Sequence, residues 1–318
     1  MPYVTKEDEE LIEVSRLYYD HNFSQLMIAK KLGISRPAVS RLLQKARDKG
    51  IVKIEICDPS DHGTKLENKI KDKFKLKKVI IVPNEGADSK VIKQRLGEAA
   101  AKYLDSLLTE DIILGVSWGT TMREVVEYLK PRSIKGMTVV QLNGGVAKAV
   151  YDTHASEIAM KIGENYHAIT FLMTLPAILD DSYLKKTIIN DKNISYQLKL
   201  ASQASVAMFT VGAFNHESVL VLADYFEPNE VNNLLKKGAV GDICSRIIDE
   251  NGKICSKELD DRTIGIEIEE LRKKEFSIAV AGGKEKLRAI YAALIGKYFN
   301  VLITDEWVAT EILKLSNN

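Results

Sequence analysis

The feature that constrains this chain most is the stretch 24–45, which reads SQLMIAKKLGISRPAVSRLLQK. Apolar residues recur there three apart, as on one face of a helix: Leu26, Ala29 and Leu32. Gly33 follows them and can take the left-handed conformation in which helices often end. Ser35 then offers a capping hydroxyl to a second helix, and Pro37 suits the first turn because its missing N–H has no partner there. The pattern predicts two short helices joined by a tight turn.

The second of these helices has two different faces. Its apolar residues are expected to pack against the first helix: Val39, Leu42 and Leu43. Its outer face mixes short polar side chains with cations, as a recognition helix does in the major groove of DNA. An ordinary helical hairpin with a solvated basic face is the alternative. The predicted DNA-binding residues are Gln25, Ser35, Arg36, Pro37, Ala38, Ser40, Arg41, Gln44 and Lys45.

Local charge favours the DNA-binding interpretation. Asp48 is the only acid between residues 24 and 53, whereas eight cations lie there: Lys30, Lys31, Arg36, Arg41, Lys45, Arg47, Lys49 and Lys53. Such a cluster attracts phosphate groups whatever the base sequence. The whole chain has a net charge of only +1. Affinity for nucleic acid is therefore expected to be local to this segment.

Length and composition set limits on the rest of the chain. A chain of 318 residues has room for one large domain and a small one. Its three cysteines are too scattered for a disulfide framework, no Cys/His grouping has the spacing of a zinc site, and no motif requires a cofactor. There is no leader pattern and no apolar run long enough to span a bilayer. We expect a cytoplasmic protein without metal, cofactor or membrane association.

The first part of the chain predicts a small winged helix-turn-helix domain. A first helix is expected over 6–20, capped by Thr5, and alternation over 52–56 predicts the strand of a short wing. Residues 57–63, CDPSDHG, then break all periodicity. The predicted domains are a DNA-binding domain, 1–57, and an effector-binding and oligomerisation domain, 58–318.

Beyond this boundary the pattern alternates between strands and helices. Seven short apolar runs predict strands: 79–82, 112–116, 137–142, 169–173, 206–211, 276–281 and 301–304. Amphipathic stretches such as 91–108 and 285–298 lie between most of them, which predicts a doubly wound, mostly parallel α/β sheet covered on both faces. An amphipathic segment over 65–74 precedes the first strand and fits either a linker helix or a dimer contact.

The loop 115–121, GVSWGTT, follows one predicted strand and leads into a helix near Met122. Ligands of open α/β sheets bind beyond the carboxyl ends of the strands, and the N–H groups of a helix start bind phosphate. We therefore predict that Gly119, Thr120 and Thr121 hold an anion, with a tight turn and a capping Thr as the alternative. No Gly-Lys-Ser/Thr follows, which argues against a nucleotide hydrolase.

Glycine pairs follow two other predicted strands, at 144–145 and 282–283, and paired glycines let a ligand approach the backbone closely. Polar side chains accompany these pairs and the segment 238–242. Together with the loop 115–121, they suggest a binding site for a polar anion such as a sugar phosphate. The further predicted effector-binding residues are Asn143, Gly144, Asp152, Thr153, Asp242 and Lys286.

The alternative from another class is an enzyme similar to sugar-phosphate isomerases, with the small domain as an accessory module. Asp152, His154 and Asp242 would supply its acid and base. No pair of these groups has a diagnostic spacing, and the helix-turn-helix would have no role in such an enzyme. We therefore expect a binding protein without catalytic residues.

Several segments, in this order, resemble the SorC/DeoR family of bacterial transcriptional regulators, and most of all its deoxyribonucleoside-regulator branch. The likeness covers essentially the full length of the chain. The segments that carry it are ISRPAVSRLL at 34–43, GVSWGTT at 115–121, VVQL at 139–142, AVGDICSR at 239–246 and AGG at 281–283.

The resemblance implies a repressor or activator, with repression favoured, of a carbohydrate or deoxyribonucleoside catabolic operon. Its larger domain would have the fold of sugar-phosphate isomerases and bind a phosphorylated sugar as inducer, and the protein would bind operator DNA as a dimer or tetramer. By this resemblance the phosphate would be held by Gly119, Thr120 and Thr121, and the sugar pocket would be lined by Asp152, Thr153, Asp242 and Lys286.

One position departs from the family pattern. Relatives often have Lys or Arg before the first glycine pair, whereas this chain has Asn143. A neutral amide favours neither a doubly phosphorylated ligand nor a Schiff base at that position. Lys148 lies near in the sequence, and the pattern does not decide whether Lys148 or Asn143 contacts the effector.

Overall fold

The computed structural model describes residues 6–52, 62–84, 88–145 and 153–316. The chain divides into two compact units, 1–59 and 60–318. Each unit has its own apolar core.

The smaller unit is a bundle of helices: α1 (Lys6–Ser15), the π-helix η1 (Arg16–Asp20), α2 (Gln25–Leu32) and α3 (Arg36–Asp48). Its core gathers one apolar stripe from each element: Val14, Leu17, Ile28, Ala29, Val39 and Leu43. The single first helix expected over 6–20 is thus an α-helix that continues as one π-helical turn. Val52 lies in a bend, and the remainder of the expected wing strand falls outside the described residues.

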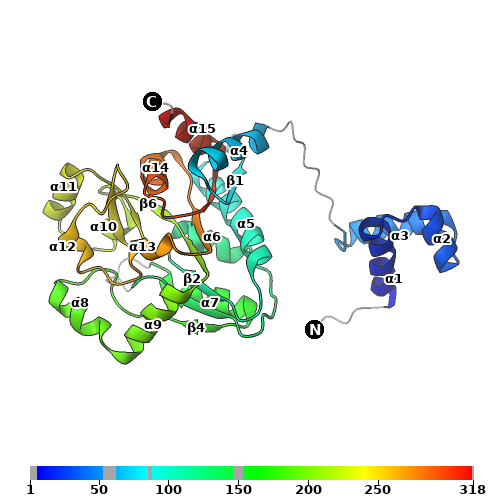
Figure 1. The fold of residues 1–318 in the computed structure, drawn as a ribbon, viewed down its shortest axis with the longest axis horizontal. Helices are drawn as coiled ribbons and strands as arrows, with labels where there is room; N and C mark the ends of the chain where they lie inside the picture. Colours follow the sequence, from blue (N-terminus) through cyan, green and yellow to red (C-terminus); the bar gives the residue numbers. More distant parts are fainter. Residues whose placement is uncertain (1–5, 53–61, 85–87, 146–152, 317–318) are drawn as a thin grey trace. The chain divides into compact units, whose positions relative to one another are not determined.

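The larger unit is built on a seven-stranded sheet in the order β1-β10-β9-β5-β2-β3-β4, in which every neighbouring pair is parallel (Figure 1). The strands are β1 (Lys78–Val82), β2 (Ile113–Val116), β3 (Thr138–Gln141), β4 (Ile169–Phe171), β5 (Val206–Phe209), β9 (Phe276–Val280) and β10 (Val301–Asp305). Each overlaps one of the seven predicted apolar runs, with ends that differ by at most two residues, and the predicted α/β class is confirmed.

Both faces of this sheet are buried, as the apolar runs require. Alternate residues of β5 belong to different cores: Val206 and Met208 to one, Ala207 and Phe209 to the other. The first core includes residues of α5 (Ser89–Leu107), α6 (Thr120–Glu127) and α7 (Ala155–Tyr166). The second includes residues of α4 (His62–Phe74), α9 (Lys192–Gln203), α14 (Leu287–Ile295) and α15 (Glu306–Leu315).

The position of α4 bears on the choice left open for residues 65–74. Leu66 and Ile70 are buried in the second core, and α4 packs against β1 and α15. The helix is therefore part of the folded larger unit.

A second, antiparallel sheet was missed by the sequence pattern. It consists of β6 (Val211–Ala213), β7 (Ala239–Ile243) and β8 (Arg246–Asp249). The run expected as one strand over 206–211 is split at Thr210, so that its last residue starts β6. These strands are short, and the glycines that let them pack closely weaken the strand signal: a Cβ on Gly241 would lie 2.6 Å from the carbonyl oxygen of Gly212.

The remaining described elements lie in the connections of the larger unit: α8 (Ser182–Ile189), α10 (Val219–Leu222), α11 (Pro228–Lys236), α12 (Lys257–Asp260), α13 (Ile268–Leu271) and the 3-10 helix η2 (Lys284–Lys286). Among the helices of the described ranges, none is long and apolar enough to cross a bilayer.

We expect Gly97→Ala to destabilise the larger unit by about 1–3 kcal/mol, because overpacking in a buried interface forces neighbouring groups apart. A Cβ at this α5 position would lie 2.7 Å from the backbone carbon of Glu124 in α6. Urea unfolding followed by tryptophan fluorescence measures the effect, since both tryptophans, Trp118 and Trp307, lie in the larger unit. The matched control is Glu98→Ala on the exposed side of α5, which should leave the midpoint nearly unchanged; equal effects would contradict the packing argument.

Candidate functional site

The strand order of the large sheet reverses between β2 and β5. From β2 the chain continues outward to β3 and β4, and it then returns to β5 on the other side of β2 before adding β9 and β10. In open α/β sheets such a reversal leaves a crevice beyond the strand ends, because the two connections lead away from it. A cavity of about 350 Å³ lies at this point and is lined by residues that come after β2 and β5, including Trp118, Gly119 and Thr210. We call it the switch-point cavity.

The start of α6 forms one wall of the switch-point cavity. Gly119 precedes the helix with a φ of 134°, and a Cβ there would lie 2.9 Å from Cγ2 of Thr210. This position therefore requires glycine. No side chain caps α6, although its first-turn N–H groups have no partner within the helix. Gly119 and Thr120 line the cavity, so this helix start can bind an anion there.

Two ionisable groups line the same cavity. Burial raises the pKa of the Asp242 carboxyl to about 6, although a hydrogen bond from Ser245 N–H and the charge of Lys286 both lower it. Burial lowers the pKa of the Lys286 ammonium to about 8; Lys93 lowers it further, while Glu285 and Asp242 raise it. Lys286 Nζ also lies 3.4 Å from Thr210 Oγ1. A partly desolvated cation of this kind gains most from an anionic ligand.

The structure brings four of the predicted effector residues to the cavity: Gly119, Thr120, Asp242 and Lys286. Four others do not line it. Thr121, Asn143 and Thr153 are almost completely buried, and Gly144 packs so closely that a Cβ would lie 2.4 Å from the carbonyl oxygen of Pro176. The glycine pair at 144–145 thus serves close packing of the chain. The predicted Asp152, and Lys148, lie outside the described residues.

Sequence reasoning missed most of the residues that line the switch-point cavity, among them six with polar side chains: Lys93, Thr210, Asn215, Glu217, Ser218 and Glu285. The sequence could have indicated three of them, because they form a polar cluster shortly after a predicted strand: Asn215, Glu217 and Ser218. Lys93 carries no such signal, since it lies on α5 and reaches the cavity only through the packing of that helix on the sheet.

Of the groups proposed for the enzyme alternative, Asp152 lies outside the described residues, and His154 does not share the cavity of Asp242. His154 lies at the start of α7 with a φ of 55°, its Nδ1 is 2.8 Å from Glu157 Oε2, and it does not line the switch-point cavity. Across the described ranges, no grouping of His, Cys, Asp and Glu could hold a metal ion.

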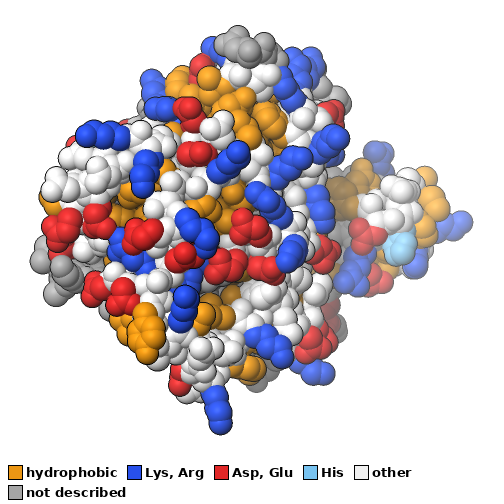
Figure 2. All heavy atoms as spheres, turned by 60° about the vertical axis from the view of Figure 1, so that its left-hand side comes forward, with side chains coloured by type: hydrophobic (Ala, Val, Ile, Leu, Met, Phe, Trp, Pro, Cys, Tyr) orange, Lys and Arg blue, Asp and Glu red, His pale blue; other side chains and the backbone are white. Residues whose placement is uncertain are grey.

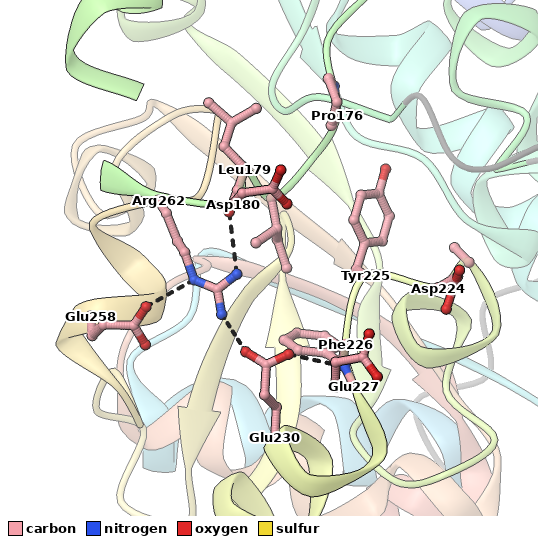
Figure 3. Close-up of a pocket in the computed structure, with 12 residues that line it drawn as sticks. Pro176, Leu179, Asp180, Asp224, Tyr225, Phe226, Glu227, Glu230, Glu258 and Arg262 are labelled. Carbon is pink, nitrogen blue, oxygen red and sulfur yellow. Dashed lines mark hydrogen bonds and ion pairs between the residues drawn. The ribbon is translucent and has the colours of Figure 1, made fainter. Parts of the chain in front are cut away.

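A second cavity, of about 640 Å³, lies between the loop before α8 and the segment that leads into α11 (Figure 3). Its cation, Arg262, is already engaged by Glu230 at 2.6 Å and Glu258 at 3.0 Å. Asp180 and Glu227 add further negative charge to the walls. This cavity is larger, yet its charge disfavours an anion, so the switch-point cavity is the better candidate for a phosphate.

The helix-turn-helix of the smaller unit has the predicted end of α2 at Gly33 and the predicted Ser35 cap of α3, and Ser24 caps α2 in addition. Met27 N–H donates to Ser24 Oγ at 3.2 Å, Gly33 ends α2 with a φ of 69°, and Ala38 N–H donates to Ser35 Oγ at 3.3 Å. The apolar stripe of α2 differs from the predicted one: Leu26 is 68% exposed, and Ile28 takes its place in the core. Ile28 and Ala29 are adjacent on the buried face, whereas Leu26 lies two residues earlier and points away.

The predicted DNA-binding residues form one surface on α3 and the turn before it, with Gln25 at the start of α2. Gln25 and Ala38 are partly buried, and the others are exposed: Ser35, Arg36, Pro37, Ser40, Arg41, Gln44 and Lys45. Gln44 is held by its neighbours, since it accepts from Arg47 Nη2 at 2.7 Å and donates to Asp48 Oδ1 at 2.8 Å. By contrast, Figure 2 shows carboxylates across the middle of one face of the larger unit, with cations between and around them. That face has no uniformly basic surface.

Comparison with known proteins adds independent information. Residues 58–314 match the family described as "Putative sugar-binding domain". The chain is 40% identical over 309 residues to the deoxyribonucleoside regulator of Bacillus subtilis, covering 97% of this chain and 98% of that one. The chain belongs to the SorC/DeoR-type family of transcriptional regulators.

Other members of this family agree in sequence and in fold. The sorbitol operon regulator of Klebsiella pneumoniae is 30% identical and aligns over 96% of this chain and 97% of its own length. The full-length structure of that regulator matches with a TM-score of 0.74 over 97% of this chain and 99% of that one, at 29% identity. A regulator from Streptococcus pneumoniae matches with a TM-score of 0.76, at 26% identity, over 80% of this chain and 98% of that one.

We expect Arg41→Ala to weaken binding to a selected operator duplex by about 1–3 kcal/mol and to relax base preference at one position, because an exposed Arg at this place on α3 can reach a base edge. Lys45→Ala should weaken binding to all duplexes alike and reduce the salt slope by about one, because it loses a phosphate contact. Selection from a random duplex library followed by salt titrations distinguishes the two. Identical behaviour of both variants would contradict the assignment.

We expect phosphate affinity to fall as the pH rises through about 8, the pKa of Lys286, because the ammonium form that attracts the anion is lost. Calorimetric titration with inorganic phosphate between roughly pH 7 and pH 9.5 measures the change. Lys286→Met should bind weakly and without this alkaline fall, whereas Lys286→Arg should keep its affinity at high pH. If phosphate affinity falls by the same amount at high pH in Lys286→Met, the fall is caused by the titration of another group.

Proposed function

We propose that the protein is a DNA-binding repressor of a carbohydrate or deoxyribonucleoside catabolic operon, whose operator binding is controlled by a phosphorylated sugar held in the switch-point cavity. The observation that carries this proposal is the pairing of the uncapped start of α6 with Lys286 in the walls of one cavity. A helix N-terminus and an ammonium group together favour a dianionic phosphate. The larger unit also matches a sugar-binding family.

The remaining walls of the cavity suit the sugar part of such a ligand. Asp242 and Glu217 are carboxylates that can accept hydrogen bonds from hydroxyl groups, and Asn215 can both donate and accept. A volume of about 350 Å³ is at the small end of ligand pockets, which favours a monophosphorylated pentose or hexose.

The names of the relatives narrow the choice of ligand. One relative is a deoxyribonucleoside regulator at 40% identity and another is a sorbitol operon regulator at 30% identity. Deoxypentose phosphates are therefore the first ligands to test, followed by phosphates of hexoses and hexitols.

DNA binding is proposed for the surface of α3. Base contacts are assigned to Arg36, Ser40, Arg41 and Gln44, and backbone contacts to Lys30, Lys31, Lys45 and Lys49. One helix-turn-helix reads only a half-site, so dimers or tetramers would be needed to read a two-fold operator.

We expect a thermal-shift screen with deoxyribose 5-phosphate, ribose 5-phosphate and glucose 6-phosphate to identify one ligand that stabilises the protein. At about 100 times the dissociation constant, binding to the folded state adds about 2.7 kcal/mol and raises the melting temperature by several degrees. The unphosphorylated sugar should give no shift, and Lys286→Met should lose most of it. The same phosphate should release the protein from its operator duplex. No shift with any of the three, or an equal shift with the unphosphorylated sugars, would overturn the proposal.

A further inference from the structure

Asn143 lies behind the wall of the switch-point cavity, just after the end of β3. It is 1% exposed and does not line the cavity, so a ligand there has no access to it. Its side chain is nevertheless engaged at both ends: Oδ1 accepts from Ser117 Oγ at 2.8 Å, and Nδ2 donates to Ser245 Oγ at 2.8 Å. We call this pair of hydrogen bonds the Asn143 bridge.

One end of the Asn143 bridge lies close to the start of α6, and the other lies close to Asp242. Ser117 is two residues before Gly119 and directly follows β2, and its N–H is fixed to the carbonyl of Met208 in β5. Ser245 lies in the turn between β7 and β8, and its N–H donates to Asp242 Oδ2 at 3.3 Å. One amide group thus connects the loop before α6 to the turn that holds the cavity carboxylate.

The turn on the Asp242 side needs such support. Cys244 and Ser245 are both non-glycine residues with positive φ, 49° and 68°, as in a two-residue hairpin that usually contains glycine. Conformations of this kind persist where surrounding contacts hold them. The next residue, Arg246, is completely buried and donates to the carbonyl of Ile266 at 2.8 Å, which anchors the other side of the turn. The Asn143 bridge is a side-chain contact that joins this turn to the end of β2.

We propose that Asn143 is a positioning residue of the effector site: its bridge fixes the Asp242 carboxylate relative to the phosphate-binding start of α6, so that one ligand can contact both. The inference rests on the proposed function. It states that Asn143 increases the affinity for the sugar phosphate although it does not contact the ligand. The phosphate subsite itself needs only α6 and Lys286. Loss of the bridge should therefore weaken sugar-phosphate binding far more than binding of inorganic phosphate.

The test uses Asn143→Leu, which keeps the branched outline of the side chain, is larger than asparagine and removes both hydrogen bonds. Calorimetry on the full-length protein measures binding of inorganic phosphate and of the sugar phosphate that gives the largest thermal shift. We expect the sugar phosphate to bind roughly 10- to 100-fold more weakly, the loss typical when a group that orients a binding residue is removed. Inorganic phosphate should change by less than about twofold, the scatter expected between sites that do not interact.

Two further variants separate positioning from general damage. Asn143→Asp has the same shape and, when protonated, can accept from Ser117 and donate to Ser245 as the amide does. At a pH acidic enough to protonate this side chain, its sugar-phosphate affinity should exceed that of Asn143→Leu and approach that of the wild type measured at the same pH, because both hydrogen bonds are retained. Ser245→Ala should weaken binding in the wild type and add nothing in the Asn143→Leu background, because its partner is already gone.

The outcomes are distinct. Equal losses for sugar phosphate and inorganic phosphate, or no loss for either, would overturn the positioning role. So would an Asn143→Asp variant that binds the sugar phosphate no more tightly than Asn143→Leu at acidic pH, or additive effects of Ser245→Ala and Asn143→Leu. A wild-type protein that binds none of the sugar phosphates would instead overturn the proposed function, and this inference with it. Tryptophan fluorescence during urea unfolding identifies a variant that has lost its fold. In that case Ser117→Ala and Ser245→Ala, which each remove one hydrogen bond, are compared instead for their binding of sugar phosphate and inorganic phosphate.

Discussion

The reversal of strand order between β2 and β5 is the constraint on which the rest of the larger unit depends. A parallel sheet buried on both faces needs a crossover for every strand, and at this one point the crossovers leave in opposite directions. The residues that follow the two strands line part of the space between them. There the chain places a glycine with a φ of 134° and an uncapped helix start, and so leaves polar backbone groups without partners at the edge of a cavity.

Charge decides which of the two cavities can hold an anion. The larger one contains Arg262, but two carboxylates already neutralise it and others surround it. The smaller one contains Lys286, whose depressed pKa of about 8 records the cost of burying its charge. An anion bound beside Lys286 would offset part of the unfavourable free energy of burying this charge. The same burial raises the pKa of Asp242 to about 6, which still leaves both groups ionised near neutral pH. In the proposed function, Lys286 would contact the phosphate group and Asp242 the sugar hydroxyls.

Sequence and structure agree best where a pattern is local. The seven strands of the large sheet are apolar runs long enough to be recognised. Gly33 and Ser35 mark helix ends in the helix-turn-helix through contacts that reach only a few residues. Sequence and structure disagree where tertiary packing, and not the spacing of residues along the chain, decides which side chains are buried. Leu26 fits a three-residue repeat yet is exposed, and Asn143 follows a strand and precedes glycines yet is buried behind the cavity. The small sheet of β6, β7 and β8 was not predicted, because its glycines permit close packing in the structure but indicate loops in the sequence.

The sequence by itself determined the helix-turn-helix, the parallel α/β class and the glycine loop that starts α6, because each depends on periodicity, capping or backbone freedom within a short segment. Only the tertiary structure decided which polar residues meet. Lys93, Thr210 and Lys286 come from three distant parts of the chain, and they share one cavity because the order of strands in the sheet brings their elements together. The contacts of Asn143 were decided in the same way: its hydrogen-bond partners are 26 and 102 residues away, and no local pattern records contacts over such separations.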